Sequence, residues 1–134
     1  MADGPDKLSI VVFDGRFDRV HYALVMASAA AATSRKVTLF FTGSALTALK
    51  PGGWRGLDGE AERTDADYKK KGVADFESLL EACRDLGVRF IACEMGLRTA
   101  GIAATDLDPD LSIDIAGVVT FLGDASKTGA MLFI

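Results

Sequence analysis

The chain has 134 residues, of which 49% are hydrophobic and 25% are charged, and its formal net charge at pH 7 is -4. A chain this rich in apolar residues is not intrinsically disordered, and its length suits one domain with a substantial core. Nucleic acids and anionic membrane surfaces would repel its negative charge. We therefore expect a single domain over residues 1–134 that binds neither nucleic acid nor membranes.

The first half of the chain alternates strand-like runs with helices. Residues 8–13 and 36–41 are short apolar runs rich in β-branched and aromatic side chains, which predict two buried strands. Residues 17–34 carry apolar side chains at helical spacing and predict a helix, and Ser44 could cap a short helix over residues 45–50. The first helix is small or apolar nearly all round, so we expect a cover on both of its sides, the second supplied by another subunit.

Residues 51–72 interrupt this alternation. The segment begins with a proline, contains several glycines and many charges, and has few apolar side chains, which predicts a long mobile loop with at most a helical turn near its end. Trp54 and Tyr68 lie within it. Because aromatic side chains dominate contact energetics, they are candidate anchors for a lid or a partner; the alternative is that they pack the loop onto the body of the domain.

The second half continues the alternation of helices and strands. The expected elements are, in chain order, a helix over 73–86, a strand over 88–93, a short helix or turn over 94–100, a loop over 102–111, a strand or extended link over 113–116, a helix over 118–127 and a strand over 131–134. Strands that alternate with helices predict an α/β fold, here one three-layer domain with a mainly parallel central sheet flanked by helices. Ligands of such sheets bind beyond the carboxyl ends of the strands, which directs attention to Cys93 and to the segment around Gly117.

Cys93 is the sharpest chemical feature of the sequence. It ends a predicted strand, and backbone N–H groups at the start of the next helix would stabilise its thiolate. Arg98 could approach and add to this effect, whereas Glu94, the next residue, opposes it by like-charge repulsion. The alternative is a small buried residue that merely ends a core strand, as free cysteines often do.

Cys83 and His21 are weaker candidates. Cys83 shares the apolar face of its helix with Phe76 and Leu79, which favours a packed core cysteine, although it could pair with Cys93 if the helix and the strand brought the two together. His21 is the only histidine and lies about one turn into the first helix. It could act as a base or a hydrogen-bond donor beside Cys93, or it could be a partly exposed helix residue.

The sequence predicts no metal site and no organic cofactor. One histidine and two cysteines cannot build a typical structural zinc site, and DLDPD over residues 106–110 lacks the glycine and the glutamate of a calcium loop. The glycines of residues 52–56 do not form a phosphate-binding loop. The opening MADGPDKLS shows no basic segment leading into an apolar one, so we expect free thiols in a reducing cytoplasm.

Nearly the whole chain resembles the DsrE/DsrF-like family, specifically the branch labelled peroxiredoxin-like or DsrE-type sulfurtransferase. The resemblance rests above all on LGVRFIACEM over residues 86–95, and also on VTLFFT over 37–42 followed by ALTAL over 45–49. It extends to the first strand, its alanine-rich helix and the C-terminal tail. One departure lies at the presumed site, where Gly96 stands in place of the serine of many relatives.

The resemblance implies a DsrE/F-like α/β domain, commonly a homo-oligomer, that handles sulfane sulfur. In such proteins a strand-end cysteine takes up sulfur as a persulfide or related adduct and passes it to a partner. Cys93 matches that cysteine, and Cys83 matches a second cysteine of some relatives. The implied function is a sulfane-sulfur carrier or sulfurtransferase, which leaves open whether the protein is an enzyme. The implied partners are further copies of the chain, with a trimer favoured, and a TusA-like or rhodanese-type carrier protein.

Two other functions remain open from the residues. One is a non-catalytic oligomeric scaffold or small-ligand binding protein in which both cysteines are packed. The other is a thiol redox protein in which Cys83 resolves an oxidised Cys93, which requires the two Cα atoms to lie within about 7 Å. An exposed Cys93 with a distant, buried Cys83 favours the carrier, two buried cysteines favour the scaffold, and a disulfide favours the redox protein.

Overall fold

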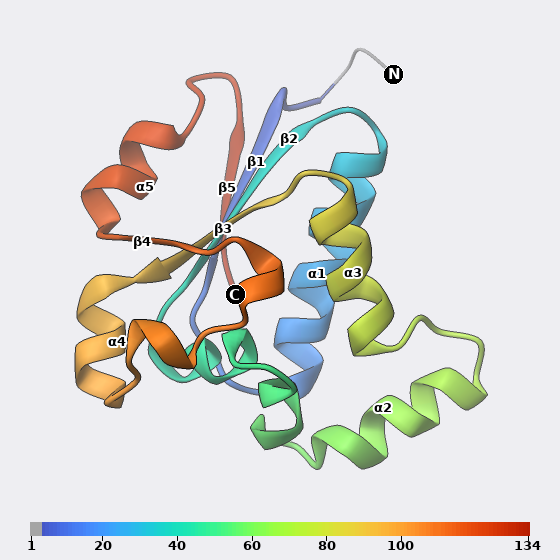
Figure 1. Ribbon diagram of the computed structural model, residues 1–134. Helices are drawn as coiled ribbons and strands as arrows, with labels where there is room; N and C mark the ends of the chain where they lie inside the picture. Colours follow the sequence, from blue (N-terminus) through green and yellow to red (C-terminus); the bar gives the residue numbers. More distant parts are fainter. Residues whose placement is uncertain (1–3) are drawn as a thin grey trace.

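Five parallel strands form one sheet at the centre of the computed structural model, which describes residues 4–134 (Figure 1). The spatial order is β4-β3-β2-β1-β5, and every neighbouring pair is parallel. The strands are β1 Lys7–Val12, β2 Lys36–Phe41, β3 Arg89–Cys93, β4 Asp114–Ala116 and β5 Ala130–Phe133. This arrangement confirms the α/β fold with a parallel sheet. Residues 1–3, the start of the segment in which we expected no secretory signal, lie outside the described residues.

One face of the sheet is covered by two helices, α1 Phe17–Ala32 and α3 Phe76–Asp85 (Figure 1). Because successive strand residues point to opposite faces, every second side chain of β1, such as Ile10, enters this larger part of the core. The helices contribute fully buried side chains such as Leu24 and Phe76. This layer holds most of the buried apolar side chains, so it dominates the stability of the fold.

The opposite face of the sheet carries a single short helix, α5 Val118–Asp124 (Figure 1). Phe121 is buried there against Phe40 of β2, with ring centroids 4.9 Å apart, and Ile91 and Cys93 of β3 complete the cluster. The helix α4 Glu94–Ala100 begins directly after β3, at the carboxyl edge of the sheet. The sheet therefore separates two clusters of different size, and Cys93 belongs to the smaller one.

Residues 51–72, predicted as a loop, contain helical structure instead. A 3-10 helix spans Gly53–Gly56, and α2 spans Ala61–Lys70. Trp54 is buried against the rings of Phe17 and Phe76, and its indole N–H donates to the Glu77 carboxylate over 2.7 Å. The segment is more helical than the predicted loop with a helical turn near its end, because contacts with α1 and α3 supply the apolar partners that the segment itself lacks. Of the two roles considered for Trp54, packing onto the body of the domain is the one observed.

The first helix is covered on one side only within residues 4–134. Its buried side chains face α3 and the sheet, whereas its other side borders an open, mainly apolar groove of about 500 Å³ beside β5. Tyr22, Val25 and Met26 line this groove. The expected second cover is therefore not supplied by the described part of the chain, and its source stays a prediction. No helix of residues 4–134 has both the length and the apolar character to cross a membrane.

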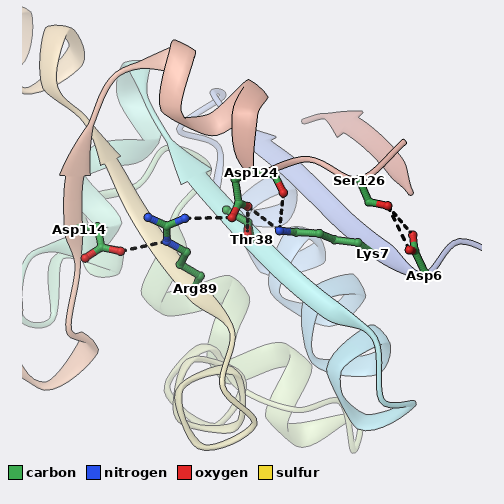
Figure 2. A network of polar contacts seen from close by, with 7 residues as sticks. All are labelled: Asp6, Lys7, Thr38, Arg89, Asp114, Asp124 and Ser126. Carbon is green, nitrogen blue, oxygen red and sulfur yellow. Dashed lines mark hydrogen bonds and ion pairs between the residues drawn. The ribbon is translucent and has the colours of Figure 1, made fainter. Parts of the chain in front are cut away.

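A network of charged side chains fixes the end of α5 to the sheet (Figure 2). The Asp124 carboxylate accepts hydrogen bonds from Lys7 Nζ at 2.7 Å, Thr38 Oγ1 at 2.5 Å and Arg89 Nη1 at 2.9 Å. Arg89 also bonds to Asp114 through Nε over 3.0 Å, which links β3 to β4. Lys7 Nζ additionally donates to the Asp124 carbonyl over 2.6 Å, so the helix predicted over 118–127 ends here.

These contacts outweigh the cost of burying the carboxylate. Burial by itself raises the pKa of Asp124. The hydrogen bonds from Lys7, Thr38 and Arg89 and the charge of Lys7 lower the pKa, and their combined effect is larger than that of burial. The pKa of Asp124 therefore lies below the usual value of 3.8. Such a group stabilises the folded state at any pH above its unfolded pKa, and this contribution is lost as the pH falls through the folded value. Asp124 is thus an acid-sensitive anchor of α5.

We expect Asp124→Asn to lower the free energy of unfolding by about 2 kcal/mol at pH 7, because Lys7 and Arg89 stay in place without the negative charge that they bind. The difference from the unmodified chain should shrink as the pH falls below about 4, where the carboxylate of the unfolded chain becomes protonated, and on through the lowered pKa of the folded protein. Urea unfolding at several pH values measures it. Asp67→Asn removes an exposed pair with Lys71 and serves as the control, with a change below about 0.5 kcal/mol. Equal effects of the two substitutions would contradict the anchor role.

Candidate functional site

Cys93 occupies the junction between β3 and α4 at the carboxyl edge of the sheet. It is the last residue of the strand and the N-cap of the helix, and its Sγ accepts a hydrogen bond from the Gly96 N–H over 3.4 Å. The strand pairs Cys93 with Ala116, which brings Gly117 and the start of α5 alongside it. The sequence pattern therefore placed Cys93 correctly at a strand end, and the N–H donor that it anticipated is that of Gly96.

A surface hollow of about 340 Å³ opens beside Cys93. It is lined by Cys93, Glu94, Met95, Arg98, Gly117, Val118 and Val119. Cys93 itself is only 5% exposed, whereas Met95 and Val119 on the rim are 69% and 81% exposed. The thiol is thus a nearly buried group in the wall of an open hollow whose rim is largely apolar.

The valines of α5 and Met95 were not predicted as site residues. A signal for them existed, because Gly117 was expected at the carboxyl end of a strand. What sequence could not show is that this strand, β4, pairs directly with β3 and so sets Val118 and Val119 opposite Cys93.

Arg98 shares the hollow with Cys93, as the sequence suggested. Its Nη2 lies 2.6 Å from Glu94 Oε1, one helical turn away along α4. Both side chains are more than half exposed. Arg98 therefore lines the same hollow as Cys93, but its guanidinium is already paired with the Glu94 carboxylate.

Gly96 is closely surrounded in this structure. A Cβ atom there would come within 2.8 Å of Leu46 Cδ1, 3.0 Å of Thr42 Oγ1 and 3.4 Å of Cys93 Cβ. A serine, the residue that the family resemblance led us to expect here, would require the Leu46 side chain to shift. The glycine lets the first turn of α4 lie close to Cys93 and to the 3-10 helix Gly43–Leu49, which follows β2.

Cys83 lies on the other side of the sheet from Cys93. It is fully buried in α3, in the core formed with α1, and its thiol contacts the Leu24 carbonyl over 3.6 Å. Burial raises the pKa of Cys83 to about 12, so almost none of it is thiolate at neutral pH. Both cysteines are free thiols. The structure therefore does not bring Cys83 to Cys93 as a second thiol, and it gives no support to a redox pair.

His21 also stays away from Cys93. Its Nε2 lies 2.8 Å from the Ala74 carbonyl, and its ring packs against Phe17 and Tyr68. These contacts belong to the layer of α1 and α2, and the residue is buried rather than partly exposed. Its position suits a structural role better than that of a base for Cys93. Within residues 4–134 no cluster of three or more His, Cys, Asp or Glu side chains could hold a metal ion.

Comparison with known proteins gives the same family for most of the chain. Residues 58–133, a span that includes Cys93, match the model of the DsrE/DsrF/DrsH-like family. The uncharacterized protein YrkE of Bacillus subtilis (strain 168) is 28% identical over 100% of both chains. The sulfur carrier protein DsrE2 of Allochromatium vinosum is 27% identical over 96% of this chain and 98% of its own.

Solved structures share the fold. The protein of unknown function MTH1491 from Methanobacterium thermoautotrophicum superposes with a TM-score of 0.66 at 17% identity, over 98% of this chain and 100% of that one. The ychN protein from E. coli superposes with a TM-score of 0.58 at 17% identity, over 96% and 99% of the two chains. At such low identities the likeness concerns the fold alone.

We expect a small neutral alkylating reagent to label Cys93 at least about tenfold faster than Cys83 in the folded protein, because only Cys93 borders a surface hollow and Cys83 is held as a buried thiol. Peptide mapping by mass spectrometry after timed reaction measures both rates. In denaturant the two rates should become similar. Faster labelling of Cys83 in the folded state would contradict the arrangement described here.

Proposed function

The chain belongs to the DsrE/DsrF/DrsH-like family, and from that premise we propose that it carries sulfane sulfur as a persulfide on Cys93 and passes it to a partner protein. The name of one relative, a sulfur carrier protein, supports the sulfur-relay role. We place the protein in a reducing cytoplasm, because the proposed chemistry needs a free thiol. The protein is an enzyme if it makes sulfur transfer from donor to acceptor faster than the two react without it, and otherwise it is a carrier only.

The observation that carries this proposal is the position of the Cys93 sulfur. It lies in the wall of a 340 Å³ hollow at the carboxyl edge of the sheet and accepts the Gly96 N–H. Ligands of parallel α/β sheets bind at this edge, and a backbone donor aimed at sulfur suits a sulfur that carries negative charge. Cys83 has neither a hollow nor such a donor.

The proposed chemistry is two displacements at sulfur. The Cys93 thiolate attacks the outer sulfur of a donor, forming a new S–S bond while the donor's S–S bond breaks and the leaving group keeps the electron pair. An acceptor thiolate then attacks the outer sulfur of the Cys93 persulfide, taking that sulfur and returning Cys93 as a thiolate. Each step only exchanges one S–S bond for another, so no outside oxidant or reductant enters.

The burial of Cys93 bears on this mechanism. Both cysteines are buried, which is the arrangement that favours the scaffold or small-ligand alternative. The hollow is what favours the carrier, because a persulfide places its outer sulfur about 2 Å beyond Sγ, toward the space in which a partner can reach it. A bound sulfur would thus be more accessible than the thiol that holds it.

A protein is the proposed acceptor, of the TusA-like or rhodanese type. The exposed rim of Met95, Val118 and Val119 offers an apolar collar around Cys93. A carrier protein that presents its own cysteine on an apolar surface could bury this collar on docking, and so exclude water from the reacting sulfurs.

We expect intact-mass spectrometry of the reduced protein, after incubation with polysulfide or thiosulfate, to show a gain of sulfur that reducing agents remove. The gain should disappear in Cys93→Ser, which lacks the accepting thiol, and persist in Cys83→Ser. Circular dichroism of both variants controls for folding. No adduct on any variant, together with slow alkylation of Cys93, would refute the carrier and leave the scaffold as the function to pursue.

We also propose that the chain is a homo-oligomer, with a trimer as the expected state. The support is the part of the sheet formed by β1 and β5, which α5 does not cover on its own face of the sheet. There the rings of Phe13 and Phe133 stack with centroids 5.4 Å apart, and Met131 lies on the same face of β5. Phe133 is 71% exposed. Purely parallel sheets are normally covered on both faces, so a second copy of the chain would supply the missing layer over β1 and β5.

We expect Phe133→Asp to shift the protein toward monomers, because a charge on this face would be buried in the assembly. Light scattering coupled to size-exclusion chromatography measures the mass. Leu86→Asp alters a half-exposed apolar residue at the end of α3, on the opposite face of the sheet, and should leave the mass unchanged. A monomeric unmodified chain, or an identical mass for Phe133→Asp, would refute this interface.

A further inference from the structure

We propose that Arg98 selects anionic sulfur donors for Cys93, and that Glu94 limits this selection by competing for the same guanidinium. This inference rests on the proposed function and deepens it, because it names the charge class of the donor. It assigns the two residues opposite effects on one measurable quantity, the preference of Cys93 for negatively charged over neutral reagents.

The first support is the composition of the hollow. Its wall contains Arg98 and Glu94 as the only charged side chains, and the remaining members besides Cys93 are apolar or glycine. A reagent that approaches Cys93 through the hollow therefore meets one positive and one negative group. Because both side chains are more than half exposed, their effect on a charged reagent is moderate and is screened by salt.

The second support is the geometry of the pair. Arg98 Nη2 and Glu94 Oε1 lie 2.6 Å apart, and this contact uses only one nitrogen of the guanidinium. The two side chains are 77% and 54% exposed, and exposed pairs of this kind contribute little to stability. An incoming anion can therefore displace the carboxylate, and the planar fork of the guanidinium is suited to bind two oxygens of that anion.

Thiosulfate illustrates what this arrangement would do in the proposed reaction. The Cys93 thiolate attacks the outer sulfur, the S–S bond of thiosulfate breaks, and sulfite leaves with the electron pair, so the total charge is conserved. Arg98 would hold the sulfonate oxygens before the attack and the sulfite oxygens after it. Glu94, by contrast, repels the dianion and occupies Arg98 while the hollow is empty.

A purely structural role for the pair predicts a different result. An ion pair between residues four apart also supports a helix, and weakening α4 would alter access to Cys93 for every reagent alike. Charge selection instead changes the rate for an anionic reagent relative to a neutral one of similar size. The ratio of the two rates therefore separates the two roles.

The test compares iodoacetate, an anion, with iodoacetamide, its neutral counterpart, as reagents for Cys93. Both form a C–S bond to the thiolate and release iodide, and peptide mass spectrometry gives each rate. We expect Arg98→Gln to lower the iodoacetate-to-iodoacetamide ratio by about threefold to tenfold, and Glu94→Gln to raise it by a similar factor. Arg98→Lys should retain most of the ratio, and salt at about 0.5 M should reduce the differences.

Lys71→Gln is the matched control, since it breaks another exposed pair of residues four apart, in α2 away from the hollow, and should leave the ratio unchanged. Charge selection is overturned by unchanged ratios, by equal shifts in the same direction in both variants, or by a Cys93 that reacts with neither reagent. If the ratios move as expected but Cys93 gains no sulfur from any donor, the carrier function fails and charge selection stands. If all variants gain sulfur equally and the ratios are constant, charge selection fails and the carrier function stands.

Discussion

The carboxylate of Asp124 determines where α5 lies on the sheet. It binds side chains from the first residues of β1 and β3 and from β2, and these strands run parallel, so their starting ends meet at one edge (Figure 2). The helix runs back from the carboxyl edge, where Val118 lines the hollow, and its seven residues span only about 10 Å. Because the helix is this short, the contacts of Asp124 at the starting edge of the sheet also fix the position of Val118 in the hollow at the carboxyl edge.

The alternation of side chains along β3 decides which cysteine can take part in chemistry. Ile91 and Cys93 point toward α5, whereas Phe90 and Ala92 point into the layer of α1 and α3 that contains Cys83. A shift of one residue in β3 would turn Cys93 into that larger core. The sheet itself thus keeps the two thiols apart, which leaves Cys93 as the thiol beside a surface hollow.

The site combines a buried reacting group with an exposed, apolar surround. In the proposed function, a reagent that fits the hollow or a protein that covers its rim would reach this nearly buried thiol. The paired charges of Glu94 and Arg98 lie on the same wall, and under the proposed charge selection the charge of the reagent would add a second criterion to its size. Both features follow from α4 starting directly at the end of β3 and from α5 crossing beside it.

The sequence by itself determined the parallel α/β architecture, the strand that ends at Cys93 and the family motif around it, because strand periodicity, helix spacing and short motifs are all encoded locally. It predicted at most a helical turn where α2 lies and left the burial of Trp54 open, since both depend on side chains of α1 and α3 that are distant in sequence. Nor could it place Cys83 relative to Cys93 or assemble the hollow from α4 and α5. These are distances between elements, and only tertiary packing of the sheet, with its order of strands, fixes them.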